Sequence, residues 1–278
     1  MAALEARGYR VVRGDHLYDQ HGYLAGTDRL RAADFTAMFA RPDVDAVFCA
    51  RGGYGAIRML EYVDWDSVRA NPKLFVGFSD ITTLHLALER ACGLVTLYGP
   101  MVATLGGALS ETAQDCFWRM VERAEPFGLY DTTGAPIRTL VGGKAEGRLA
   151  GGCLSICQAA LGAPECPDFD GRLVLIEDVG EAAYRIDRML MHLRRSGAFD
   201  RAAGFIVGDA TDWDKGLTRP PGIDLSQVWQ DVLAPLRKPT VVGFPFGHVP
   251  NPLTLPLGCL ARLDADAGTV EVLEPAVA

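Results

Sequence analysis

A serine stands at the corner between an apolar strand pattern and a helix pattern. The apolar run Leu74–Val76 reaches Gly77, and Ser79 follows two residues later. A serine on a sharp strand-to-helix turn projects its hydroxyl out of a sheet, and the free N–H groups at the helix start can bind an oxyanion. The pattern therefore predicts a nucleophile. The alternative is that Ser79 only caps the helix, because Ile81 replaces the second glycine of the G-x-S-x-G motif.

A glycine-rich turn follows another strand pattern and contains Gly52, Gly53 and Gly55. Glycine permits positive φ and close backbone approach, so the turn is suited to bind an anion or an oxyanion at a helix N-terminus. The Lys-Ser/Thr pair and the spacing of nucleotide-phosphate loops are missing, and an ordinary tight turn is the alternative. Arg51, just before this turn, is a candidate for binding a substrate carboxylate; an ion-pair partner at a strand end is its alternative.

Two adjacent acids and one histidine complete the candidate chemistry. Glu177 and Asp178 end the apolar run "RLVLIE", and neighbouring strand residues face opposite sides, so only one can point into a given site. His248 lies in a proline-rich loop that suits a general base of fixed orientation, although a lone histidine is more often structural. With Ser79, these residues follow the order Ser, acid, His that is typical of one large class of hydrolases.

The composition limits the alternatives. Of the 278 residues, 49% are hydrophobic and 22% charged, as in soluble globular proteins. The net charge of −8 without a basic cluster argues against nucleic acid and anionic membranes as partners, and no apolar run is long enough to span a bilayer. The histidines and seven cysteines have no metal-ligand spacing, so we expect no metal site. The charged N-terminus predicts no export signal.

The elements that must position these residues follow from the periodicity. Strand and helix patterns alternate over the first hundred residues, which predicts a parallel sheet covered by helices. After a helix at 111–124, the chain becomes rich in glycine and then mixes short strands with two helices, which predicts a barrel-like α+β unit. We therefore predict an α/β domain at 1–125, a linker at 126–145 and a second domain at 146–278. The predicted elements comprise strands within 9–12, 44–50, 73–78, 94–99, 172–177, 204–208, 239–244, 260–266 and 269–274, and helices within 27–42, 55–65, 80–91, 111–124, 153–161 and 182–197.

The sequence resembles the LD-carboxypeptidase family of serine peptidases, also called muramoyltetrapeptide carboxypeptidases. The resemblance covers nearly the whole chain and rests on seven blocks that occur in the family's order. These blocks are "GYLAGTDRLRAADF", "ARGGYGAIRML", "PKLFVGFSDITTL", "YGPM", "GRLAGGCLS", "LIEDVGEAAYRIDRML" and "GHVPNPLTLPLG".

The resemblance implies roles for several residues. Ser79 would be the nucleophile, Glu177 the acid and His248 the base. The backbone N–H of Asp80, with one from the Gly52–Gly53 turn, would form the oxyanion hole. The fold would combine an N-terminal flavodoxin-like domain with a C-terminal domain built around a barrel of strands. The family acts in the cytoplasm without a cofactor, usually as a homodimer.

Three departures from the family pattern concern the substrate and the N-terminus. The family motifs "HGPM" and "GGN" read Tyr98-Gly-Pro-Met and Gly-Gly-Cys153 here, which makes Tyr98 and Cys153 candidate substrate-binding residues. The family usually begins with a strand of the type "IAVVAPS", whereas this chain starts with the helix-like "MAALEARGYRV". We therefore expect the first sheet to lack a strand, or the true start to lie upstream.

Three functions are consistent with this pattern. The first is a cytoplasmic serine LD-carboxypeptidase that removes the terminal D-alanine of murein tetrapeptide during cell-wall recycling. The second is a hydrolase of peptidyl-nucleotide antibiotics, which is the activity of the family's immunity branch. The third is a catalytically silent protein that binds an anionic ligand with its glycine turns.

Overall fold

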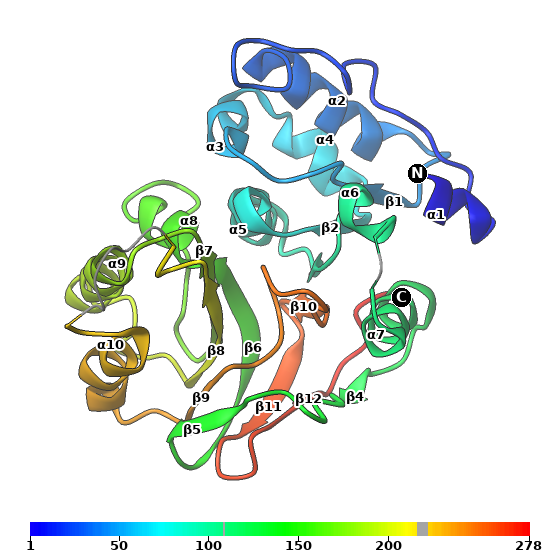
Figure 1. Ribbon diagram of the computed structural model, residues 1–278. Coiled ribbons are helices and arrows are strands. Elements are labelled where there is room, and N and C mark those ends of the chain that lie inside the picture. Colours follow the sequence, from blue (N-terminus) through cyan, green and yellow to red (C-terminus); the bar gives the residue numbers. More distant parts are fainter. Residues whose placement is uncertain (108, 216–221) are drawn as a thin grey trace.

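The computed structural model describes residues 1–107, 109–215 and 222–278, which form two sheets surrounded by helices (Figure 1). The first sheet has the order β1-β2-β3-β10. Its first three strands are parallel, as the alternating patterns predict, and β10 adds antiparallel to β3. The strands are β1 (Ala46–Phe48), β2 (Leu74–Gly77), β3 (Thr96–Tyr98) and β10 (Leu255–Leu257).

The helices of this part largely follow the predicted periodicity. Thr27 caps α2, its side chain accepting a hydrogen bond from the Leu30 N–H. The helix predicted at 55–65 is divided, because the Asp64 side chain caps a new helix that begins at Trp65. The helices are α1 (Ala2–Ala6), α2 (Asp28–Ala40), α3 (Ala56–Met59) with a 3-10 turn at Leu60–Tyr62, α4 (Trp65–Ala70), α5 (Thr82–Cys92), α6 (Val102–Leu105) and α7 (Glu111–Glu122).

The strand predicted at 9–12 is wrong. This segment lies outside any strand because Tyr9 is anchored on α7, where its ring stacks on Trp118 at 6.0 Å and its hydroxyl donates to Glu122. Among the described residues, no strand pairs with the outer edge of β1. A cavity of about 530 Å³ lies there, lined by side chains that include Val11, Met38 and Val47.

The second sheet has eight strands in the order β4-β12-β11-β6-β7-β8-β9-β5, with a parallel centre from β6 to β9. Only two residues connect β5 to β6, although three strands separate them in the sheet order. The sheet must therefore curl to bring these strands together, which gives the predicted barrel-like form. The strands are β4 (Gly128–Leu129), β5 (Arg138–Val141), β6 (Lys144–Cys153), β7 (Leu173–Val179), β8 (Gly204–Thr211), β9 (Thr240–Val242), β11 (Leu260–Asp264) and β12 (Thr269–Val272).

The stretch 126–145, which we expected to be a linker, supplies β4, β5 and the start of β6 to the second sheet. The glycines of β6 suggest turns in the sequence, but they lie in a strand where other groups approach closely. A Cβ at Gly152, for example, would lie 2.7 Å from the ring of Tyr98. Glycine within a strand often marks such close approach. Because the glycine-rich sequence suggests turns, it does not predict the ten-residue strand β6.

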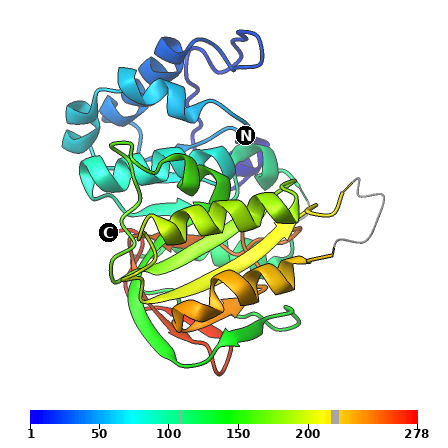
Figure 2. The same ribbon diagram turned by 90° about the vertical axis from the view of Figure 1, so that its left-hand side faces the viewer.

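The two sheets share one hydrophobic core. Val76 and Leu97 of the first sheet and Leu149, Leu175 and Ile206 of the second belong to the same buried cluster. The other face of the second sheet packs against α8 (Leu154–Ala159), α9 (Ala183–Arg195) and α10 (Leu225–Val232), the last of which has no predicted counterpart. Figure 2 shows α9 and α10 side by side across the strands. None of the described helices is long and apolar enough to cross a membrane.

Candidate active site

Ser79 occupies the turn between β2 and the helical residues that follow it. Its φ is +69°, a left-handed conformation that costs a non-glycine residue roughly 1–3 kcal/mol. Gly77 makes the turn possible, because a Cβ there would lie 2.6 Å from the Ile81 side chain. The Ser79 hydroxyl caps no helix. The local structure is therefore a strained strand-to-helix corner whose hydroxyl is available for another partner.

That partner is His248, and a carboxylate lies behind it. His248 Nε2 is 3.0 Å from Ser79 Oγ, and its Nδ1 is 2.7 Å from Glu177 Oε2. The same carboxylate oxygen accepts the His248 main-chain N–H at 3.1 Å. The Glu177 side chain is fully buried, whereas that of His248 is 18% exposed. The three groups form a continuous hydrogen-bonded series from a partly accessible hydroxyl to a buried anion.

The backbone around His248 fixes the orientation of its ring. Thr211 Oγ1 donates to the His248 carbonyl at 2.8 Å, and the ring of Phe78 packs against the imidazole at 5.0 Å. Gly247 has φ +78°, and a Cβ there would overlap the carboxyl group of Glu177. The loop can therefore bring the imidazole and the carboxylate together only with glycine at this position.

Glu177 and Asp178 face opposite sides of β7, as strand alternation requires. Asp178 is also buried, but it accepts the Ser155 N–H at 2.7 Å at the start of α8 and the Val179 N–H at 2.8 Å. Asp178 thus binds the main chain at the start of α8, whereas Glu177 contacts His248.

The electrostatics of the site favour a charged imidazolium. Burial lowers the pKa of His248, but the hydrogen bond and the negative charge of Glu177, with a contribution from Asp178, outweigh it and raise the pKa above its ordinary value. A base whose protonated form is stabilised by a neighbouring carboxylate can accept the proton of a serine hydroxyl. The arrangement is chemically suited to nucleophilic catalysis.

The glycine turn lies directly against the serine corner. A Cβ at Gly52 would lie 3.0 Å from Ser79 Cβ. Asp80 links the two segments, because its Oδ2 accepts the Ala56 N–H at the start of α3 at 2.9 Å. Gly53 has φ +127°, which favours glycine. The Asp80 side-chain contact has no signal in the sequence, because its partner lies 24 residues away.

The three substrate-binding candidates lie in different surroundings. Arg51 is exposed beside the glycine turn. Tyr98 and Cys153 are only 1% and 5% exposed, so little of either residue is accessible to a substrate. The Tyr98 hydroxyl instead donates to Glu177 Oε1 at 2.5 Å. The sequence indicates this contact only through the position of Tyr98, which ends β3 next to the end of β2.

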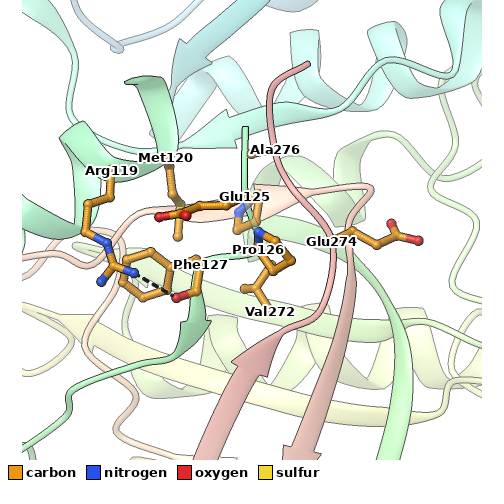
Figure 3. A pocket seen from close by; sticks show the side chains of 9 residues that line it. Arg119, Met120, Glu125, Pro126, Phe127, Val272, Glu274 and Ala276 are labelled. Atoms are coloured by element: carbon orange, nitrogen blue, oxygen red, sulfur yellow. Dashed lines mark hydrogen bonds between the residues drawn. The ribbon is translucent and has the colours of Figure 1, made fainter. Parts of the chain in front are cut away.

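One small cavity shares no lining residue with the candidate active site. This cavity, shown in Figure 3 between Arg119, Phe127 and Glu274, has a volume of about 10 Å³, enough for roughly one water molecule. No group of three or more His, Cys, Asp or Glu side chains in the described ranges is arranged to hold a metal ion.

The chain is similar to proteins of one family along almost its entire length. A family model described as the LD-carboxypeptidase N-terminal domain matches residues 1–99, and one described as the LD-carboxypeptidase C-terminal domain matches 146–263. A putative carboxypeptidase of Streptomyces coelicolor is 44% identical over 283 residues, covering 97% of this chain and 88% of the relative. A probable murein peptide carboxypeptidase of Bacillus subtilis is 38% identical over 271 residues, covering 97% and 84%.

Solved structures have the same fold. The muramoyltetrapeptide carboxypeptidase from Oxalobacter formigenes has a TM-score of 0.80 at 30% identity, covering 98% of this chain and 91% of that one. The microcin C7 self-immunity protein MccF, in complex with aspartyl sulfamoyl adenosine, has a TM-score of 0.88 and covers 100% and 90%. At 24% identity, the second likeness concerns the fold alone. With both domain matches and the sequence relatives, these findings show that the chain belongs to the LD-carboxypeptidase family of serine peptidases.

Proposed function

We propose that this protein is a cytoplasmic serine LD-carboxypeptidase that releases the terminal D-alanine from murein tetrapeptide. The observation that carries the proposal is the hydrogen-bonded series from Ser79 through His248 to Glu177. The names of the Bacillus subtilis relative and the Oxalobacter formigenes structure support a murein peptide as the substrate class. Because members of the family usually form homodimers, we also expect this protein to be a dimer.

In this mechanism His248 Nε2 accepts the proton of Ser79 Oγ as the oxygen attacks the carbonyl of the L,D bond. The Glu177 carboxylate stays ionised and stabilises the imidazolium. The N–H groups of Asp80 and of the Gly52–Gly53 turn would bind the oxyanion. The imidazolium then protonates the amine of the leaving D-alanine, which leaves an acyl-enzyme on Ser79. Water, deprotonated by His248, hydrolyses this ester and restores the serine.

The test is mass spectrometry of the purified protein with tetrapeptide, and with tripeptide and LL-linked peptides as controls. The wild type should release D-alanine from the tetrapeptide only. Ser79→Ala should reduce kcat by at least about 10³-fold, because the nucleophile is lost, and circular dichroism should show an intact fold. Undiminished release by Ser79→Ala would refute the mechanism.

A second substrate class is supported by the fold likeness to MccF, whose structure holds aspartyl sulfamoyl adenosine. In this alternative the same serine would attack the acyl bond of a peptidyl-nucleotide or another acylated amine. A thermal-shift comparison of nucleotides with murein peptides separates the two classes. Stabilisation and turnover by peptidyl-nucleotides alone would replace the murein proposal. Ligand binding without turnover of either class would favour a silent binding protein.

A further inference from the structure

Tyr98 contacts both ends of the Ser79–His248–Glu177 series. It is the last residue of β3 and only 1% exposed. Its hydroxyl donates to Glu177 Oε1 at 2.5 Å and accepts the Ser79 main-chain N–H at 3.3 Å. The oxygen of Glu177 that contacts Tyr98 is not the one that contacts His248, which is Oε2. The carboxylate is therefore held from two sides.

These contacts close a ring of hydrogen bonds. The ring runs from the Ser79 N–H to the Tyr98 hydroxyl, then to Glu177, to His248 and back to Ser79 Oγ. Tyr98 ends β3 of the first sheet and Ser79 lies at the corner after β2, whereas Glu177 lies on β7 of the second sheet and His248 in the loop between β9 and β10. The ring thus spans the contact between the two sheets, and Tyr98 supplies the contact that closes it.

The Tyr98 hydroxyl is a permanent donor in this position. Burial, together with the charge of Glu177, raises the pKa of Tyr98 well above its ordinary value, so the proton stays on the phenol throughout the neutral range. Tyr130 offers a comparison within the same chain. It is equally buried, at 3% exposure, but its hydroxyl donates at 2.8 Å to the main-chain carbonyl of Thr254, which is outside the ring.

We infer that Tyr98 is a positioning residue of the proposed hydrolase, which fixes the Glu177 carboxylate against His248 and holds the strained Ser79 backbone. The inference rests on the proposed function. Without the Tyr98 hydroxyl, no donor from the described part of the chain would reach Oε1 of the fully buried Glu177 side chain. The carboxylate would then either rotate toward another donor or interact more strongly with the positive charge of the His248 imidazolium. Both changes alter catalysis without altering a substrate contact.

The experiment compares Tyr98→Phe with Tyr130→Phe. Each variant removes one hydroxyl from a buried ring, so both should lower the melting temperature, Tyr98→Phe more strongly because its hydroxyl binds a charged group. Only Tyr98→Phe should lower kcat, by about 10- to 100-fold, with KM within about twofold of wild type. The acid limb of its kcat/KM profile should move to higher pH, because a less stabilised Glu177 anion favours the protonated form of His248.

A second variant keeps the inference testable if Tyr98→Phe folds poorly. Incorporating 3-fluorotyrosine at position 98 keeps the hydroxyl and makes it a stronger donor, so the acid limb should move to lower pH. The inference is overturned if Tyr98→Phe matches Tyr130→Phe in kcat and pH profile, or if the fluorinated protein has the wild-type limb. Full activity of Ser79→Ala would instead overturn the proposed function, so the two failures are distinguishable.

Discussion

Replacing Glu177 by Gln should nearly abolish turnover, whereas the adjacent change Asp178→Asn should leave it within about tenfold of wild type. The two residues are neighbours on β7, of similar burial, and each carries one carboxylate. They differ in their partners, because Glu177 accepts hydrogen bonds from His248 and Tyr98, and Asp178 accepts the N–H groups of Ser155 and Val179.

The magnitude follows from the charge that Glu177 presents to the imidazolium. At 2.7 Å between Nδ1 and Oε2, the centres of the two charges are about 4 Å apart, and their attraction is about 4 kcal/mol at an effective dielectric constant of about 20. Losing it alone lowers kcat by about 10³-fold. The amide of Gln must also present an N–H to either His248 or Tyr98, which disturbs the tautomer or the ring and brings the total toward about 10⁴-fold.

Asp178→Asn affects stability more than catalysis. The amide would direct its N–H₂ group at one of two N–H donors, which costs about 1–3 kcal/mol of folding free energy. The loss of its more distant charge has a smaller effect on His248. We expect a change in kcat below about tenfold, which corresponds to roughly 1.4 kcal/mol in the barrier.

The assay is steady-state kinetics of D-alanine release by both variants, with circular dichroism and thermal melting as controls for folding. A dead Asp178→Asn beside a working Glu177→Gln would refute the assignment and the register of β7. Two variants of equal activity would show that the carboxylate behind His248 has no special part in the reaction.

Two further predictions concern stability. His85 is buried, and burial lowers its pKa to about 4. In the unfolded chain a histidine titrates near 6.5, so below that pH the unfolded state binds more protons than the folded one. The free energy of unfolding should therefore fall by about 2 kcal/mol between pH 7 and 4.5. Urea unfolding of wild type and His85→Gln at both pH values tests this, and an equal pH dependence in the two proteins would contradict it. Fusing a short, extended apolar segment to the N-terminus should fill the cavity beside β1 and raise the melting temperature by several degrees; an unchanged melting temperature together with full activity would show that the present sheet needs no further strand.

Some features of the candidate site are encoded locally and can be predicted from the sequence. The corner at Ser79 follows from an apolar strand, a glycine and an immediate helix pattern, all within about ten residues. The caps of α2 and α4 are equally local, since Thr27 and Asp64 bind N–H groups three residues ahead. Such patterns depend on backbone conformation and hydrogen bonds between near neighbours, so they remain visible without the fold.

Strands in glycine-rich sequence are harder to predict. The glycines of β6 have the composition of turns, but close packing against β7 and Tyr98 requires them. At residues 9–12 the error runs the other way, because the sequence pattern suggests a strand where the structure has none. The contacts of Tyr9 with α7 keep this segment away from β1. In both cases a tertiary contact overrides the local preference.

The sequence by itself determined the types of chemical group, their order along the chain and the alternating elements that present them. Strand alternation left open which of Glu177 and Asp178 meets His248, and the resemblance to the family chose Glu177. The sequence also suggested a substrate contact for Tyr98. Only the tertiary structure shows the contacts themselves, because those of His248 with Glu177 and Ser79 join residues 71 and 169 positions apart, and that of Tyr98 with Glu177 joins residues 79 apart. Such contacts depend on how a curled sheet packs on a second one, which no local pattern of residues encodes.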